Sequence, residues 1–346
     1  MSLLLTRTQN LRAASPNLYK WEDRASEVGA LDFFLRDTDY PGGILTTDLK
    51  DLARQSIGST LQAPVLNFDS GVTISNARSV TITDALNTSQ MVTFTFVIYS
   101  WGWTETPTAH MNNEIKLQED WNFNYIKHLH AFAKLADTAC ISQLGTDKTQ
   151  VFGDPLTYTT PGNMVTATLA DEFRVFADIG PIMHSNDIGG QLNMIGNPGF
   201  MSIINRMAGY DIYNQVNHQI QVQNRVLYFS NRIANAANMG ATFYTVPSGS
   251  CGILFRHEPE ALLRNRYRTG HEWGMDRLMG LDIPVSTYYY EAVDNYSADH
   301  GAASAHNTRA GKRFYGFSVD MCYVTPHNSD RTTIPSPILG VQVATS

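Results

Sequence analysis

Residues 91–103, MVTFTFVIYSWGW, alternate in the way that a β-strand alternates between its two faces. The two alternating sets are Val92, Phe94, Phe96 and Ile98, and Thr93, Thr95, Val97 and Tyr99. At about 3.3 Å per residue this run can extend roughly 40 Å, much further than the usual strand of five or six residues. The pattern predicts a ribbon that reaches beyond its own domain.

A second period-two segment precedes this run at residues 71–83, GVTISNARSVTIT. Val72 and Ile74 stand before a Ser-Asn-Ala turn, and Val80 and Ile82 follow it. Two alternating segments around such a turn indicate a hairpin. With the run at 91–103 they predict an extended β-ribbon over residues 63–107.

The period changes to 3.6 after Pro107. Apolar residues recur at spacings of four and three, which is the stripe of an amphipathic helix. The stripe consists of Trp121, Tyr125, Leu129, Phe132 and Ala136. We expect one helix from about Met111 to Leu144, with Gly145 as the residue that ends it. Such a helix is roughly 50 Å long and would cross nearly the whole molecule.

The first 62 residues read as an arm. A short helix is predicted over residues 25–34, and a turn at residues 41–43 precedes a second short helix from Asp48 to Gln55. Thr46 or Thr47 is the expected N-cap of the second helix. Because this segment has few residues of its own against which to bury its aromatic side chains, we expect it to lie on other structure, such as another subunit.

The remaining chain predicts mixed helix and sheet. Leu169, Phe173, Val175 and Phe176 have helical spacing, and residues 191–211 read as a strand, a turn and a helix to Met207. Residues 241–256 read as a strand pair that turns at 248–252, followed by a short helix after Pro259. Residues 314–325 and 338–344 read as strands, so the chain ends in a sheet.

Composition changes the interpretation of these elements. Charged residues make up 16% of the 346 residues, against about 25% in an average soluble protein, while aromatic residues reach 11%. Interface centres are depleted in charge and enriched in aromatic residues and Met, so much of the surface is expected to face protein. The alternative is an uncharged, Thr-rich β protein. The net charge of −7 argues against a simple nucleic-acid binder, although not against a container.

The strongest candidates for metal ligands are His128 and His130, which follow closely behind Glu119 and Asp120. Positions i and i+2 of a helix point about 200° apart, so the two imidazoles cannot chelate one metal from one face. The chain contains neither an H-E-x-x-H, a P-loop, a G-x-G-x-x-G nor a nucleophile-elbow motif. The sequence therefore predicts no catalytic, cofactor-binding or metal-binding residues and no cofactor.

Cysteines and basic residues add two smaller expectations. The cysteines are far apart and odd in number: Cys140, Cys251 and Cys322. The sequence therefore predicts neither a disulfide framework nor a zinc ribbon, and it predicts folding in a reducing cytosol. The N-terminus has no signal-peptide apolar region, and no apolar run is long enough to span a membrane. The basic cluster of the chain is the segment containing Arg256, Arg264, Arg266 and Arg268. Either phosphate contact or inter-subunit ion pairs would suit it.

The order of these elements resembles that of the major capsid proteins of tailed bacteriophages with the HK97 fold. The stretches that carry the resemblance are MVTFTFVIYSWGWTETPTAHMNNEI, QLNMIGNPGFMSIINRMA and ATFYTVPSGSCGILFRHEPEALLR, which are similar to coat proteins of phages of Bacteroidetes hosts. The resemblance implies an α+β chain divided into four parts. These are an N-terminal arm at 1–62, an extended loop (E-loop) at 63–107, a peripheral domain with a spine helix at 108–184 and 318–346, and an axial domain at 185–317.

The resemblance further implies a non-enzymatic protein that self-assembles into the icosahedral or prolate head shell around a double-stranded DNA genome. Its expected partners are its own copies in hexamers and pentamers, portal, scaffolding and head accessory proteins, and packaged DNA without sequence specificity, but no membrane. It would be assembled in the bacterial cytoplasm and located in the virion. The expected inter-subunit contact residues are Phe94, Phe96, Ile98, Tyr99, Arg264, Arg266 and Arg268. Two alternatives remain: an encapsulin-like nanocompartment shell, and a hydrolase with a dispersed active site.

Overall fold

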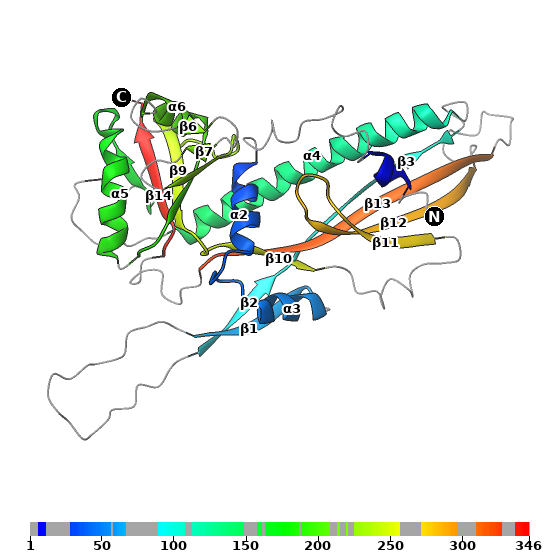
Figure 1. Ribbon diagram of the computed structural model, residues 1–346, viewed down its shortest axis with the longest axis horizontal. Coiled ribbons are helices and arrows are strands. Elements are labelled where there is room, and N and C mark those ends of the chain that lie inside the picture. The colour runs from blue at the N-terminus through cyan, green and yellow to red at the C-terminus, as the bar shows by residue number, and fades with distance from the viewer. Residues whose placement is uncertain are drawn as a thin grey trace, which may run out of the picture.

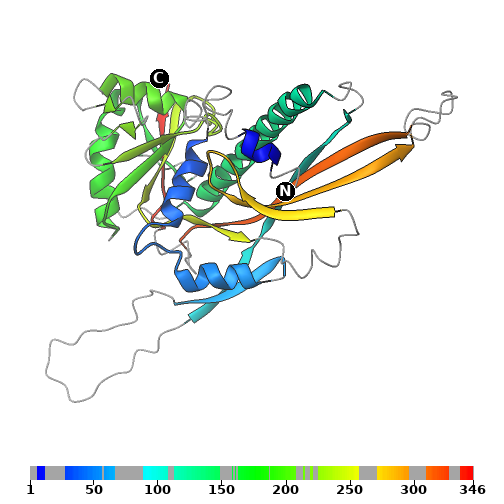
Figure 2. The ribbon, with the colours of Figure 1, turned by 45° about the vertical axis from the view of Figure 1, so that its right-hand side comes forward.

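The structure is a computed structural model of the chain. It describes residues 6–11, 28–56, 58–66, 89–107, 113–148, 158, 160, 163–186, 188–207, 213–214, 219–220, 225–256, 271–295, 309–326 and 336–345. The predicted hairpin at 71–83 and the predicted helix after Pro259 lie outside the described residues. Figures 1 and 2 show an elongated arrangement in which a long sheet and a second sheet lie toward opposite ends and a long helix runs between them. The mixed α+β class predicted from the sequence is confirmed.

The long sheet is built around its longest strand, β13. Its members are β3 (Val97–Glu105), β10 (Gly252–Arg256), β11 (His271–Arg277), β12 (Pro284–Asn295) and β13 (Arg309–Val324). β13 pairs antiparallel with β12, β10 and β3, and β11 pairs with β12. Alternate residues of β13, among them Tyr315, Phe317 and Val319, are buried on the face that meets the long helix. The prediction of a strand over residues 314–325 is confirmed.

The long helix, α4 (Glu114–Asp147), has 34 residues, which corresponds to about 51 Å. It begins at Asn113, whose side chain accepts hydrogen bonds from the backbone N–H groups of Ile115 and Lys116, at 3.1 and 3.2 Å. The structure buries the whole predicted stripe in the core shared with the long sheet: Trp121, Tyr125, Leu129, Phe132 and Ala136. The helix begins and ends three residues later than predicted, so Gly145 lies inside it and not beyond it.

The second sheet has the strand order β4-β14-β9-β5-β8. Its strands are β4 (Val165–Ala167), β5 (Leu192–Gly196), β8 (Val226–Phe229), β9 (Met239–Pro247) and β14 (Leu339–Ala344). Helices α5 (Arg174–Ser185) and α6 (Pro198–Met207) pack on it through a separate core, in which the rings of Phe176, Phe200 and Phe243 stack. The 3-10 helix η4 (Leu169–Asp171) precedes α5, and β6 (Tyr213–Asn214) pairs with β7 (Gln219–Ile220). The strand, turn and helix predicted at 191–211 are confirmed as β5 and α6.

Helix α2 (Gly29–Thr38) packs against α4 and β10 and also contacts β8 and β5 of the second sheet. The helix predicted at residues 25–34 is confirmed from Gly29 and continues to Thr38, and it buries Leu31, Phe33 and Phe34 in the core of the long sheet. The second predicted arm helix is confirmed as α3 (Thr47–Gln55), with the hydroxyl of Thr46 accepting from the backbone N–H of Leu49 at 3.3 Å.

The predicted ribbon divides between two sheets. β1 (Thr60–Leu66) pairs antiparallel with β2 (Ser89–Thr95) in a two-stranded sheet of their own, whereas β3 enters the long sheet. The run 91–103 is therefore two strands that meet at Phe96, and the prediction of one continuous strand is wrong. Figures 1 and 2 both show β1 and β2 leaving the body of the molecule.

A further prediction about strand partners is corrected. The strands predicted at 241–256 exist as β9 and β10, but they lie in different sheets and do not pair with each other. The division into parts also differs from the sheets: β14, assigned to the peripheral part, lies in the second sheet between β4 and β9. β12 and most of β13, assigned to the axial part, lie beside α4 in the long sheet.

Candidate interaction surfaces

The base of the β1–β2 ribbon is held by the buried guanidinium of Arg256 at the end of β10. Its Nε and Nη2 atoms donate to Asp320 Oδ2 of β13 at 3.0 and 2.7 Å. Its Nη1 atom donates to Ser56 Oγ at 3.2 Å and to the carbonyl oxygen of Gly58, just before β1. The guanidinium carbon lies 4.4 Å from the ring centroid of Phe96, just after β2. At the base of the ribbon, Arg256 thus contacts residues beside the start of β1 and the end of β2, and it also contacts the long sheet. A planar cation with several donor groups can make all of these contacts at once.

A small apolar core completes this attachment. Phe96 and Leu61 from the ribbon pack with Leu254 of β10 and with Leu45 and Ala53 of the arm. The backbone N–H of Phe96 also donates to the carbonyl oxygen of Ser59 at 2.9 Å. The direction in which the ribbon leaves the body is therefore fixed by packing as well as by the cation.

We expect Arg256→Ala to destabilise the chain by about 3 kcal/mol, because it leaves the Asp320 carboxylate without its buried partner. Arg256→Lys should recover part of this loss, since an ammonium group cannot make the same set of in-plane bonds. Urea unfolding measures both. Arg54→Ala is the matched control, because Arg54 forms an exposed pair with Asp51 and should change stability by less than about 0.5 kcal/mol. Equal effects at the two positions would contradict the role given to Arg256.

The predicted contact residues of the ribbon region do not share one environment. Ile98 is 64% exposed and Phe94 is half-buried, whereas Phe96 and Tyr99 are buried inside the chain. Tyr99 points toward α4 and its hydroxyl lies 2.9 Å from that of Tyr323. Phe96 and Tyr99 are therefore corrected to core positions.

Two apolar side chains that were not singled out as contacts are exposed in the same region, Met91 at 57% and Val97 at 45%. The basic contact candidates Arg264, Arg266 and Arg268 lie outside the described residues. The exposed apolar surface of the region is thus formed by Met91, Val97 and Ile98.

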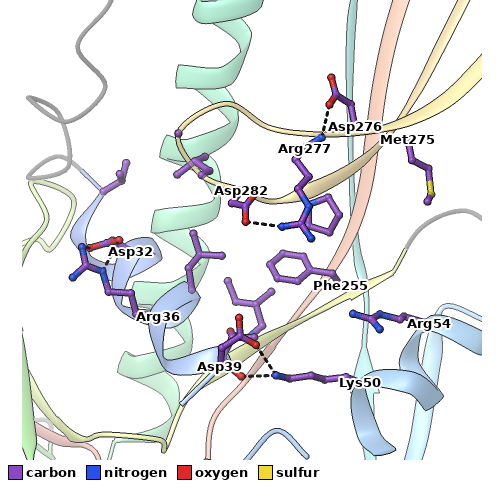
Figure 3. A pocket seen from close by; sticks show the side chains of 17 residues that line it. Asp32, Arg36, Asp39, Lys50, Arg54, Phe255, Met275, Asp276, Arg277 and Asp282 are labelled. Atoms are coloured by element: carbon purple, nitrogen blue, oxygen red, sulfur yellow. Dashed lines mark hydrogen bonds and ion pairs between the residues drawn. The ribbon is translucent and has the colours of Figure 1, made fainter. Parts of the chain in front are cut away.

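A pocket of about 950 Å³ opens beside the ribbon base, between α2, α3, β10 and the turn from β11 to β12 (Figure 3). Its apolar lining includes Phe255 and Ile253, and charged side chains stand around it. The charges are matched in pairs: Lys50 Nζ with Asp39 at 2.8 Å, Arg277 with Asp282 at 2.5 Å, and Arg36 with Asp32 at 3.1 Å. Burial raises the pKa of Asp32, opposed by Arg36. This combination suits an apolar side chain with polar flanks better than it suits acid–base chemistry.

The two histidines first considered as metal ligands have structural contacts. His128 Nδ1 lies 2.7 Å from the carbonyl oxygen of Asn124, and the imidazole stacks on Trp103 of β3 at 5.2 Å. His130 is half-buried on α4. In the part of the chain that the structure describes, no group of three or more His, Cys, Asp or Glu side chains could hold a metal ion. The described helices also include none with the length and apolar character of a membrane span.

Buried charges at the junctions of the elements were missed by the sequence reasoning. Asp137 of α4 is fully buried and accepts from the backbone N–H of Leu31 at 2.9 Å and from Ser230 Oγ at 2.5 Å. It lies at the N-terminus of α2, where Val28 offers no side-chain cap. The signal that could have revealed it is an acidic residue beside Ala136 and Cys140 on the apolar side of a helix.

Asp37 holds the other end of α2. Its carboxylate accepts from the backbone N–H groups of Gly249 and Cys251, at 2.6 and 2.8 Å, in the turn between the two sheets. Gly249 has a φ of +81°, which favours glycine at this turn. Burial raises the pKa of both Asp37 and Asp137. Helix α2 is therefore fixed to α4 at one end and to the inter-sheet turn at the other.

A third buried cluster attaches the N-terminal residues 6–11. Arg7 Nη2 lies 3.6 Å from Glu105 Oε1 at the end of β3, and Arg7 Nη1 donates to Gln118 of α4 at 3.0 Å. Tyr315 donates to Glu105 Oε2 at 3.1 Å, and burial together with this carboxylate raises the pKa of Tyr315. Arg313 adds a second cation 3.4 Å from Glu105. The arm thus reaches the far end of β3 as well as its beginning.

The chain is similar to solved structures of capsids from phages and from a GTA particle. The chain is similar to the capsid of a native GTA particle at 12% identity, covering 89% of this chain and 94% of that chain with a TM-score of 0.45. It is similar to the capsid of the cyanophage P-SCSP1u at 10% identity, covering 91% and 94% with a TM-score of 0.45. For the mature capsid of bacteriophage PhiM1 the values are 12% identity, 89% and 90% coverage and a TM-score of 0.45. No protein-family model and no curated protein sequence matches the chain.

Proposed function

We propose that this chain is the major capsid protein of a tailed phage, a shell subunit of the HK97 type that self-assembles around double-stranded DNA. The observation that carries the proposal is the β1–β2 ribbon. Among the described strands, β1 and β2 pair only with each other, and they leave the body of the molecule. An isolated two-stranded ribbon is at best marginally stable in water, so such an element needs a surface on another molecule.

The exposed apolar side chains support an interaction surface at the same place. Met91, Val97 and Ile98 are exposed although the chain has only 16% charged residues with which to cover its surface. Apolar contacts next to a rigidly anchored ribbon are what an inter-subunit interface requires. The anchoring by Arg256 and Phe96 gives the ribbon a fixed direction, which a closed shell also requires.

We assign the parts of this proposed subunit from the sheets. The ribbon corresponds to the E-loop, and α4 with the long sheet to the peripheral domain. The second sheet with α5 and α6 corresponds to the axial domain. The proposed partners are other copies of the chain in hexamers and pentamers, with portal, scaffolding and accessory proteins and packaged DNA. Assembly in the bacterial cytoplasm, location in the virion and a kinship with coat proteins of Bacteroidetes phages belong to the same proposal.

We expect the full chain, alone or with its phage partners, to form closed shells visible by electron microscopy, and Ile98→Glu to prevent this without unfolding the chain. Ile98 is exposed, so the new carboxylate costs little in the monomer, but it would be buried without a partner in an interface. Sedimentation velocity measures the assembled fraction and circular dichroism the fold.

Ile98→Val is the control for this experiment, because it keeps an apolar side chain at the same place and should assemble. A wild-type chain that stays a compact monomer under all these conditions would contradict the proposed function. Double-stranded DNA in the isolated particles supports a phage head, whereas a packaged enzyme would indicate a nanocompartment.

A further inference from the structure

An exposed row of residues at every fourth position winds along α4 and crosses the side that faces away from the long sheet at its middle. The row consists of Ile115, Glu119, Phe123, Lys127, Ala131 and Leu135, all of them exposed. Residues spaced by four form one of the ridges through which α-helices pack into each other's grooves. We call this row the outer ridge.

The outer ridge contains large apolar side chains that the chain itself does not cover. Ile115 is 73% exposed, Phe123 67% and Leu135 58%. At 100° per residue, Phe123 lies almost opposite Tyr125 and Phe132 of the buried stripe. Figure 1 shows α4 along one side of the molecule, with the long sheet on its other side. Phe123 therefore points away from the body.

The charges on the outer ridge are arranged symmetrically about Phe123. Glu119 lies about one turn before it and Lys127 about one turn after it, each roughly 6 Å away along the helix axis. Neither side chain has an interaction with another residue in the described part of the chain. If a second α4 crosses antiparallel at Phe123, Glu119 of each helix lies over Lys127 of the other. The outer ridge is thus complementary to itself about a two-fold axis.

We propose that the outer ridge of α4 docks on the outer ridge of α4 in a second copy of this chain, antiparallel and with Phe123 at the two-fold axis. Two ridges whose residues are spaced by four interdigitate when the helices cross at about 50°, with their axes 8–10 Å apart. The contact comprises a Phe123–Phe123 pair flanked by two Glu119–Lys127 ion pairs. It rests on the proposed function, since a closed shell has two-fold axes at which such a contact can form.

The charge order favours a second copy over an unrelated helix. A helix from another protein would need a carboxylate and a cation in the matching order, whereas this chain supplies both at the required spacing. A single contact of this kind is small beside a stable interface of about 1,600 Å². The outer ridge is therefore a contact that adds to others in an assembly, and it should be detected by a method that captures weak contacts.

Disulfide trapping tests the position of the two-fold axis. In the full chain, Phe123→Cys should form a disulfide-linked dimer under mild oxidation, several-fold more than Leu135→Cys. Leu135 is also exposed on the same ridge, at 58% against 67% for Phe123, but lies about 18 Å from Phe123 along the helix, so its two copies would be far apart. The native cysteines Cys140, Cys251 and Cys322 are buried and free, so they do not compete. Equal trapping at the two positions would overturn the proposal.

Charge exchange tests the ion pairs in the Phe123→Cys background. Glu119→Lys alone and Lys127→Glu alone each place like charges opposite each other and should reduce trapping several-fold, while the double exchange should restore it. A double exchange that stays as low as the single ones would overturn the antiparallel arrangement. Chains that form shells but show no preferred trapping at position 123 refute this inference alone, whereas chains that form no shells refute the proposed function.

Discussion

Leu129→Asp is expected to prevent the chain from folding to a soluble protein. Leu129 is buried between α4 and the long sheet, at the middle of the stripe from Trp121 to Ala136. The substitution removes a buried leucine and places an unpaired carboxylate there, at a combined cost of at least about 4 kcal/mol. That is a large share of the 5–15 kcal/mol by which native proteins are usually stable. The soluble fraction after expression and the far-ultraviolet circular dichroism measure the result.

Leu135→Asp is the matched control for this prediction. It makes the same chemical change on the same helix, but Leu135 is exposed on the outer ridge. Its effect on the free energy of unfolding should stay within about 0.5 kcal/mol. Soluble, folded Leu129→Asp protein would mean that α4 does not pack on the long sheet through this stripe.

The long helix could be predicted because its pattern persists over many turns. The N-terminal end is set by a local cap, whereas the C-terminal end could not be predicted, because it depends on contacts that are distant in sequence. Asn113 supplies the N-cap, and at the other end Asp147 is buried and accepts a hydrogen bond from the hydroxyl of Thr325. Gly145 read locally as a stop, yet these tertiary contacts carry the helix past it.

The break between β2 and β3 could not be read from alternation. Phe96, Val97, Ile98 and Tyr99 form a continuous apolar run, which is compatible with either face of a strand at each position. The side to which Phe96 points is decided by its packing in the small core with α3, and the side to which Tyr99 points by its packing against α4. The phase of alternation therefore shifts between them, and the residues predicted as contacts divide into buried and exposed ones.

Partners of strands were the least predictable part of the fold. β9 and β10 are joined by a short turn, which locally indicates a hairpin. In the structure the side chains of Asp37 and Thr38 accept from the backbone N–H groups of this turn and of Ile253, at 2.6 to 2.8 Å. The turn is thus bound to α2 and carries the chain from one sheet to the other. The bounds of the peripheral and axial parts also depend on strand pairing, which joins residues far apart in the sequence.

Asp137→Ala is expected to lower the free energy of unfolding by about 2–4 kcal/mol, because it leaves buried hydrogen-bond donors without an acceptor. These donors are the backbone N–H of Leu31 and the hydroxyl of Ser230, and the guanidinium of Arg232 lies 3.8 Å away. Asp137→Asn should cost less, since the amide oxygen can still accept from Leu31 and the amide nitrogen can donate to Ser230. Urea unfolding of both variants gives the comparison.

The pH dependence separates the charge of Asp137 from its hydrogen bonds. Burial raises its pKa in the folded chain above the usual value near 4, despite the opposing effect of Arg232, and Cys140 and Tyr323 also lie close enough to interact with it. When the pKa of a group is higher in the folded chain than in the unfolded chain, the group contributes its full stability at a pH below its pKa in the unfolded chain. This stability is lost as the pH rises through its pKa in the folded chain. The wild type should therefore gain stability relative to Asp137→Asn as the pH falls from 7 to 4. Because other carboxylates, including Asp37, are common to both proteins, their titration cancels in this difference. A difference that moves the other way would show that the helix N-terminus and Arg232 outweigh burial, and that Asp137 acts as a charged cap of α2.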